Sequence, residues 1–275
     1  MKAITVQEQL LAYVLCFFVV FLSALQVSAK DLKDLSVEEI VQKSNEVDKI
    51  PDWSSKNTMR LVSKGGSERV RESINYNMLD QNGHDTIRLI RFTAPADIKG
   101  TNILIHEHSD GSDDIWMYLP SMKKVRRLIA ANKKDSFVGT DFSYADIVTP
   151  KVQDYSHTLL RRESLNGIPC FVIESIPRTE EIKKNSGYAK TVLWIRTDSF
   201  VRIKSELYDP SGMLYKIMQV SSVKEVDRKR GKWLVEKVEM RNIETGHSTI
   251  ITFNNIKVGE ALDHKLFLPN RLDQE

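Results

Sequence analysis

Residues Trp116 to Asp146 read WMYLPSMKKVRRLIAANKKDSFVGTDFSYAD, and this stretch best indicates the fold. It begins with the alternation typical of a strand, continues through a basic segment and ends in small, aromatic and acidic residues. A loop of this length in a compact chain is usually functional or disordered. Disordered segments contain few aromatic residues, whereas this one contains Phe137, Phe142 and Tyr144. We therefore predict an ordered flap that packs across a sheet.

Within the flap, we assign different tasks to different residues. Gly139 lacks a Cβ atom and allows the backbone to bend sharply. We expect Asp141 to bind backbone amides, Arg126 or Arg127. A turn from Tyr144, capped by Asp141 or Ser143, is favoured over a general acid/base site made by Asp141 and Asp146. The flap residues are Phe137, Gly139, Asp141, Phe142 and Tyr144.

The segments WMYLPSMKKVRRL and KKDSFVGTDFSYAD resemble the signature of the outer-membrane lipoprotein-sorting family of LolA-like periplasmic proteins. The resemblance extends over roughly the whole mature chain. It implies an incomplete antiparallel β-barrel with a helical or loop lid over an apolar cavity for acyl chains, and it does not imply catalysis. This signature belongs to a different branch from the shorter carriers, so their ligand-contacting residues are not carried over.

Residues 1–29 are expected to be a signal peptide. Leu10 to Leu25 is apolar, and Val27, Ser28 and Ala29 are the residues that a signal peptidase would read. We predict cleavage after Ala29, which leaves a single domain of residues 30–275 in the periplasm. The alternative is an uncleaved membrane anchor, but the apolar run is shorter than the roughly 20 residues that a span needs.

Charge and cysteine content narrow the class of protein further. A formal net charge of +3 is far from that of a nucleic-acid-binding protein, so we expect no such partner. Cleavage removes Cys16 and leaves Cys170, which excludes an intramolecular disulfide and requires stabilisation by a core. We interpret Cys170 as a small buried residue rather than a nucleophile, and we expect a monomer.

The pattern after residue 53 predicts an antiparallel sheet. Strand-like segments follow one another with short turn signals, and no helix separates most of them. About ten or eleven strands would curl strongly. The expected fold class is mainly β: a curled antiparallel sheet forming an incomplete half β-barrel, with a helix and a loop flap over the concave apolar face. The last segment, Leu262 to Leu268, is included among the strands.

A helix is expected over Ser36 to Lys49. Ser36 and Glu39 match a capping box, and apolar residues follow at helical spacing. This helix either plugs one end of the sheet or acts as a mobile lid, and the sequence leaves both interpretations open.

Alternation within the strands predicts which face holds a ligand. On Val70 to Met78, the even positions are largely apolar and the odd positions are polar. We expect the apolar face to be concave. On Val201 to Tyr208, by contrast, Arg202, Lys204 and Glu206 are expected on the wet face. The lipid-binding candidates are Val70, Ile74, Tyr76, Met78, Trp116 and Trp194.

The basic segment of the signature has two interpretations. Lys123, Lys124, Arg126 and Arg127 are either a solvated strand edge, protected from aggregation by its charges, or a docking surface for lipid headgroups or an acidic partner. Lys133 and Lys134 in the flap are expected to be exposed and free for a partner.

Motifs for catalysis or metal binding are weak. His106, His108 and Asp110 lie beside a hairpin turn and have no further histidine at a fixed spacing, so a solvated hairpin end is favoured over a metal site. The sequence has no nucleophile elbow, Walker loop or dinucleotide-binding fingerprint. We expect no enzyme activity, metal or cofactor.

These observations favour a periplasmic carrier of lipid or lipoprotein acyl chains. The partners expected for such a carrier are an inner-membrane lipid exporter of the RND type or an outer-membrane acceptor. The alternative is a soluble accessory or sensor protein that uses the same fold to bind a protein partner of an exporter.

Overall fold

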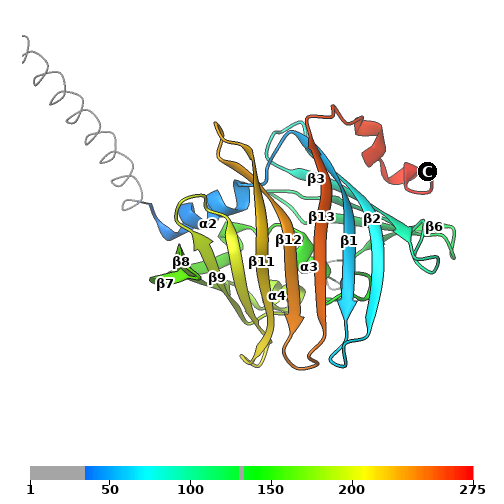
Figure 1. Ribbon diagram of the computed structural model, residues 1–275. Coiled ribbons are helices and arrows are strands. Elements are labelled where there is room, and N and C mark those ends of the chain that lie inside the picture. The colour runs from blue at the N-terminus through cyan, green and yellow to red at the C-terminus, as the bar shows by residue number, and fades with distance from the viewer. Residues whose placement is uncertain (1–34, 130–132, 275) are drawn as a thin grey trace, which may run out of the picture.

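The computed structural model describes residues 35–129 and 133–274, so the expected signal peptide lies outside the described residues. The described chain is mainly β, and its strands form one 13-stranded antiparallel sheet that curls without closing (Figure 1). The expected half-barrel fold is confirmed. The strands are β1 (Asp52–Val62), β2 (Glu68–Leu79), β3 (Thr86–Ala94), β4 (Asn102–His106), β5 (Asp114–Leu119), β6 (Lys124–Leu128), β7 (Tyr155–Leu165), β8 (Ile168–Pro177), β9 (Lys190–Arg196), β10 (Arg202–Tyr208), β11 (Leu214–Asp227), β12 (Lys232–Asn242) and β13 (Ser248–Val258).

The strand order explains the long loop of the signature. From edge to edge the order is β6-β5-β4-β3-β2-β1-β13-β12-β11-β10-β9-β8-β7, so β6 and β7 are opposite edges of the sheet. The chain between them must therefore cross one whole face. It does so through the flap, which contains η2 (Phe137–Gly139), α3 (Tyr144–Ile147) and η3 (Val152–Asp154).

Two further helices accompany the sheet. α2 (Val37–Glu46) begins at Ser36, and the predicted capping box is present: Glu39 N donates to Ser36 Oγ, and Ser36 N donates to the Glu39 carboxylate. Ile40 and Val41 of α2 pack against Phe171, Leu193 and their neighbours on β8 and β9. α4 (Glu180–Ser186) lies between β8 and β9 and was not predicted. None of the described helices is long and apolar enough to cross a membrane.

The C-terminal segment is not a strand, so that prediction is wrong. It forms η4 (His264–Phe267) and η5 (Pro269–Arg271), drawn in red in Figure 1. β13 already has β1 and β12 as neighbours, so no free edge is available there. Phe267 and Leu272 pack instead against Leu89 and Leu104, on the face of the sheet opposite the flap.

Candidate functional site

The register of β1 and β2 identifies the inner face of the sheet, which we define as the face covered by the flap. Met59 packs in one cluster with Phe137 and Phe142 of the flap. It lies opposite Arg71 on β2, and Asn57 lies opposite Ser73. The inner side chains of β2 are therefore the odd-numbered polar ones, and the even-numbered ones point outward.

The predicted lipid-binding face is therefore wrong. Met78 and Tyr76 belong to the outer cluster beneath the C-terminal segment. Trp116 lies opposite Leu104 in that cluster, and Trp194 is covered by the ammonium of Lys204, 4.0 Å from its ring. The C-terminal segment and the side chain of Lys204 cover part of this outer apolar surface, whereas Val70 is 45% exposed. The candidates that lie outside are Val70, Ile74, Tyr76, Met78, Trp116 and Trp194.

Two adjoining cavities lie on the inner face. The first, of about 390 Å³, lies between α2, α4 and the strands from β7 to β12. The second, of about 240 Å³, lies under the flap and against β1, β2, β3, β12 and β13. Together they reach the size typical of small-molecule sites. Residues that line both are Asn45, Asp146, Val148, Thr149, Pro150, Arg202 and Met218.

The walls of these cavities are mixed in polarity. Ile90, Val238 and Phe253 give the second cavity an apolar side. Asn57, Asn75 and Asn77 form a polar strip between Ile90 and Phe253, because they occupy the inner positions of β1 and β2. Ser55 Oγ donates to Asn57 Oδ1 at 2.7 Å, and Ser73 Oγ donates to Asn75 Oδ1 at 3.1 Å. The inner face is thus only partly the apolar surface that the sequence predicts.

Three aromatic residues hold the flap against the inner face. Phe137, Phe142 and Tyr144 are buried in the cluster that also contains Phe92. The rings of Phe137 and Tyr144 meet edge to face with centroids 5.4 Å apart. Gly139 has a φ of 73°, which is a left-handed conformation, so the backbone turns sharply between these anchors.

Asp141 has partners that the sequence did not suggest. Its Oδ2 accepts hydrogen bonds from Thr249 Oγ1 at 2.7 Å and His247 Nδ1 at 2.6 Å. The expected pairing with Arg126 or Arg127 is wrong, because these side chains lie on β6 at the edge of the sheet whereas Asp141 lies over β13.

α3 is positioned by its own capping residues. Ser143 Oγ accepts from Asp146 N, and the Asp146 carboxylate accepts from Ser143 N, which confirms Ser143 as the cap. Tyr188 Oη lies 3.0 Å from both Asp146 carboxylate oxygens, and Lys216 Nζ lies 3.7 Å from one of them. Asp146 is therefore occupied in capping and pairing, and burial raises the pKa of Tyr188. Neither Tyr188 nor Lys216 was singled out from the sequence.

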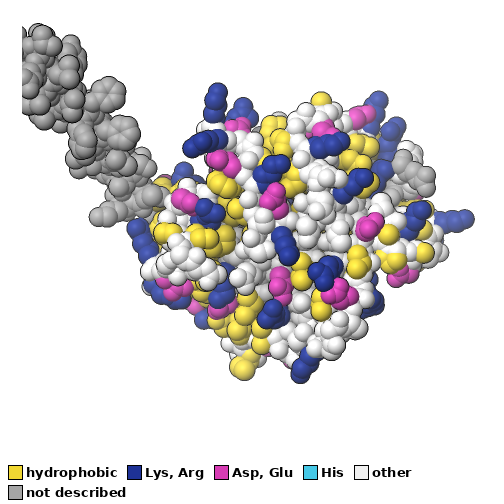
Figure 2. All heavy atoms as spheres, viewed as in Figure 1, with side chains coloured by type: hydrophobic (Ala, Val, Ile, Leu, Met, Phe, Trp, Pro, Cys, Tyr) yellow, Lys and Arg dark blue, Asp and Glu magenta, His cyan; other side chains and the backbone are white. Residues whose placement is uncertain are grey.

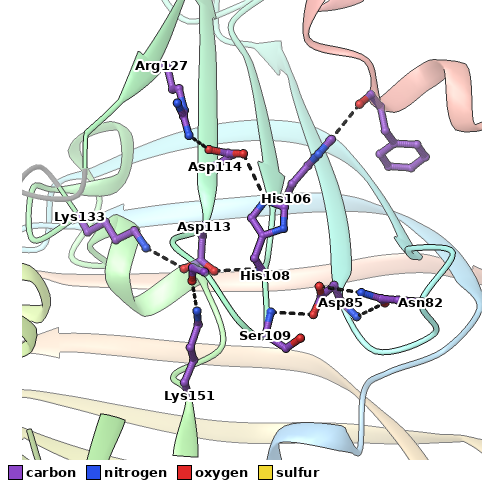
Figure 3. Close-up of polar contacts among 12 residues, drawn as sticks. Asn82, Asp85, His106, His108, Ser109, Asp113, Asp114, Arg127, Lys133 and Lys151 are labelled. Carbon is purple, nitrogen blue, oxygen red and sulfur yellow. Dashed lines mark hydrogen bonds and ion pairs between the residues drawn. The ribbon is translucent and has the colours of Figure 1, made fainter. Parts of the chain in front are cut away.

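A polar network borders the first cavity (Figure 3). Lys133 Nζ lies 2.7 Å from Asp113, and both line the cavity, so the expectation that Lys133 is free is wrong. Lys151 donates to the Gly111 carbonyl oxygen. Across the hairpin, His108 lies 3.2 Å from Asp114 and His106 donates to the Phe267 carbonyl oxygen. In residues 35–129 and 133–274 no cluster of side chains suits a metal ion.

The basic segment forms edge strand β6. Lys123, Lys124, Arg126 and Arg127 are exposed, and Arg127 pairs with Asp114. Their location fits a protected sheet edge, and docking remains a proposal. Elsewhere, Figure 2 shows Lys and Arg mixed with Asp and Glu on the visible face, without one large patch of either sign.

Comparisons with known proteins agree with this architecture. A family model with the description "Uncharacterized protein" matches residues 84–274. An outer membrane lipoprotein-sorting protein domain from Vibrio parahaemolyticus is 31% identical, with a TM-score of 0.78 over 86% of this chain and 98% of that one. A DUF1329 family protein from Desulfovibrio piger ATCC 29098 is 28% identical, with a TM-score of 0.78 over 86% and 97%.

A LolA superfamily protein from Nitrosomonas europaea shares the fold at 19% identity, with a TM-score of 0.63 over 85% of this chain and 98% of that one. No curated protein sequence matches the chain. The family model covers more than half of the chain, and the Vibrio domain is similar over most of it. Both agree with the resemblance that the WMYLP and DFSYAD segments indicate. The chain therefore belongs to the family of outer-membrane lipoprotein-sorting protein domains, and it shares the fold of the LolA superfamily.

Proposed function

We propose that this protein is a non-enzymatic periplasmic carrier that holds lipid or lipoprotein acyl chains in the two adjoining cavities and helps to sort them towards the outer membrane. The observation that carries the proposal is the pair of cavities lined by the inner face, the flap and two helices. Burial of an alkyl chain there contributes about 0.8 kcal/mol per CH₂ group. Affinity thus grows with chain length and needs no chemical reaction.

The name of the Vibrio relative, a lipoprotein-sorting domain, supports the same function. A carrier of this kind takes its cargo from a donor and passes it to an acceptor. We propose an RND-type exporter of the inner membrane as the donor and an outer-membrane protein as the acceptor.

The carrier function can be tested with a variant that fills the region where the two cavities meet. Met218 lines both cavities, so Met218→Trp places an indole where the chain would lie. Met213 is 69% exposed on the turn before β11, so Met213→Trp is a matched control. We expect native mass spectrometry and Nile red titration to show lipid and dye bound to the wild type and to Met213→Trp, and much less to Met218→Trp. Equal binding by both variants would contradict the proposal.

The second candidate is an accessory or sensor protein that binds a protein partner. The exposed cations of β6 favour it, because edge strands and basic surfaces both suit protein contacts. Reversing Lys123 and Lys124 to Glu separates the two functions. If the protein is a sensor, the variant loses its partner in a pull-down, and the purified wild type contains no lipid. If it is a carrier, the wild type and the variant both contain lipid.

A further inference from the structure

Arg202 is a cation that lines both cavities and has no hydrogen-bond or ion-pair partner among the described residues. Its neighbours on β10 alternate regularly, and the sequence places Arg202 on the wet face. A register shift between Arg202 and Lys204 changes this. Arg202 lies opposite Ile195, which packs with the cavity-lining Val41 and Leu193. Lys204 lies opposite the outward Trp194. The irregularity thus turns Arg202 inward, where it lines both cavities.

The other cations that line the cavities have partners: Lys133 pairs with Asp113, and Lys151 donates to the Gly111 carbonyl oxygen. Arg88, in the second cavity, donates to Asn77 and to the Ile147 carbonyl oxygen. Arg202 makes no ion pair and no hydrogen bond with any residue of 35–129 or 133–274. Asp48 and Asp146 attract it only through space.

An unpaired guanidinium in such a place is costly. Arginine remains protonated in proteins and presents five N–H donors, and loss of water around a charge is strongly unfavourable unless an opposite charge replaces it. Burial accordingly lowers the pKa of Arg202. Carboxylates and phosphates are the groups whose geometry matches a guanidinium in two parallel hydrogen bonds.

The polar strip offers further unused donors. Arg88 Nε can only donate, so its 2.8 Å contact identifies the accepting atom of Asn77 as Oδ1. Asn77 Nδ2 then remains a donor, and it has no partner although Asn77 is only 1% exposed. Asn57 Nδ2 in the second cavity and Ser205 Oγ in the first are also unpartnered. Buried donors of this kind normally have acceptors, and here the described chain supplies none.

We propose that the natural occupant is an anionic amphiphile whose carboxylate or phosphate binds Arg202 at the junction of the two cavities, with its chain along Val238, Ile251 and Phe253. The inference rests on the proposed carrier function and adds the class of headgroup. The tail provides affinity by burial, and the guanidinium selects charged lipids over neutral ones of equal length.

The test compares ligands that share a chain and differ in the headgroup. Palmitate, hexadecyl phosphate and hexadecanol are titrated into the complete mature protein by calorimetry. We expect at least one anionic lipid to bind about tenfold or more tightly than hexadecanol, which is the order of one charge-assisted hydrogen bond. Arg202→Met removes the difference in affinity between the anionic lipids and hexadecanol, and thermal denaturation followed by circular dichroism shows that the variant is folded.

Lys204→Met is the matched control, because it removes the same charge from the same strand on the outer face, where Lys204 contacts Glu206 and Trp194. It keeps the preference for anionic lipids. Equal affinity of anionic lipids and hexadecanol for the wild type overturns the inference but leaves the carrier intact, whereas no binding of any lipid overturns both. Inorganic phosphate that displaces palmitate at millimolar concentration shows a site for a free anion and also overturns it.

Discussion

Thr249 and Asp141 exchange two hydrogen bonds between β13 and the flap. Asp141 N donates to Thr249 Oγ1 at 3.0 Å, and Thr249 Oγ1 donates to Asp141 Oδ2 at 2.7 Å. One hydroxyl thus accepts from the flap backbone and donates to the flap side chain. Thr249 is 0% exposed, so no water replaces these bonds if the hydroxyl is lost.

We predict that Thr249→Val lowers the free energy of unfolding by about 1–3 kcal/mol, the usual cost of leaving a buried polar group without its partner. Thermal denaturation followed by circular dichroism measures the effect. Thr252→Val is the control, because Thr252 lies on the same strand and faces outward opposite Lys237 and Thr58. Similar losses for both variants would mean that β-strand packing, rather than the bond to the flap, is responsible.

The aromatic anchors and the basic edge are expected to respond differently to mutation. Phe142 is 4% exposed, so we predict that Phe142→Ala destabilises the protein by about 3–5 kcal/mol. Lys123→Glu with Lys124→Glu changes the stability by less than about 0.5 kcal/mol, because both side chains are exposed. Chemical denaturation of the two variants gives both values. If the lysine variant is unfolded while Phe142→Ala keeps the wild-type free energy of unfolding, the flap is not packed as described.

The orientation of β2 predicts which of its positions affects binding. Asn75 lines the second cavity, so Asn75→Asp places a carboxylate beside the ligand and weakens the binding of palmitate by about tenfold or more. Tyr76→Asp lies on the outer face and leaves the affinity unchanged, although it disturbs the packing of the C-terminal segment. Asn254→Asp, an exposed change of the same type, is the matched control. Fluorescence displacement measures the three affinities.

Acid sensitivity is expected from His157, which lines the first cavity. Its Nε2 donates to the Val152 carbonyl oxygen at 3.1 Å, and its Nδ1 lies 2.8 Å from Ser175 Oγ. Burial lowers the pKa of His157 from its ordinary 6.5. The unfolded chain therefore takes up a proton before the folded chain does as the pH falls. Stability that is fully present above pH 6.5 is lost between that pH and the lowered pKa.

The slope of the unfolding free energy against pH reports the difference in bound protons between the unfolded and folded states. We predict that His157→Gln lowers this difference in the window below pH 6.5 by at most about one proton. Urea denaturation at a series of pH values measures it. His84→Gln is the control, because the side chain of His84 is exposed in a turn. An unchanged slope in His157→Gln would show that another group causes the acid sensitivity.

Much of the fold follows from local signals. Ser36 and Glu39 begin α2 as the sequence indicates, and Gly83 has the positive φ that its hairpin needs. The burial of Phe137, Phe142 and Tyr144 reflects the simple difficulty of leaving three aromatic rings in water.

The faces of the strands could not be assigned from alternation alone. Alternation distinguishes two faces of β2 but does not say which is concave, and Met78 is covered by Phe267 from the far end of the chain. Arg202 was assigned to the wrong face because a register shift leaves no mark in the sequence. α4 was missed because it has only 7 residues, although Thr179 caps it and Gly187 ends it.

The pairing of β1 with β13 also has a consequence for how the protein is made. The first and last strands of the sheet, β1 and β13, pair at its centre. This pairing joins the two halves of the sheet and brings together the most distant parts of the sequence of strands. Contacts of this kind are slow to form, because a long chain must close before they stabilise anything. A chain that is synthesised from its N-terminus lacks this pairing until β13 has left the ribosome. We therefore expect the proposed carrier to load lipid only after it has folded, and a truncated chain without β13 to bind no lipid.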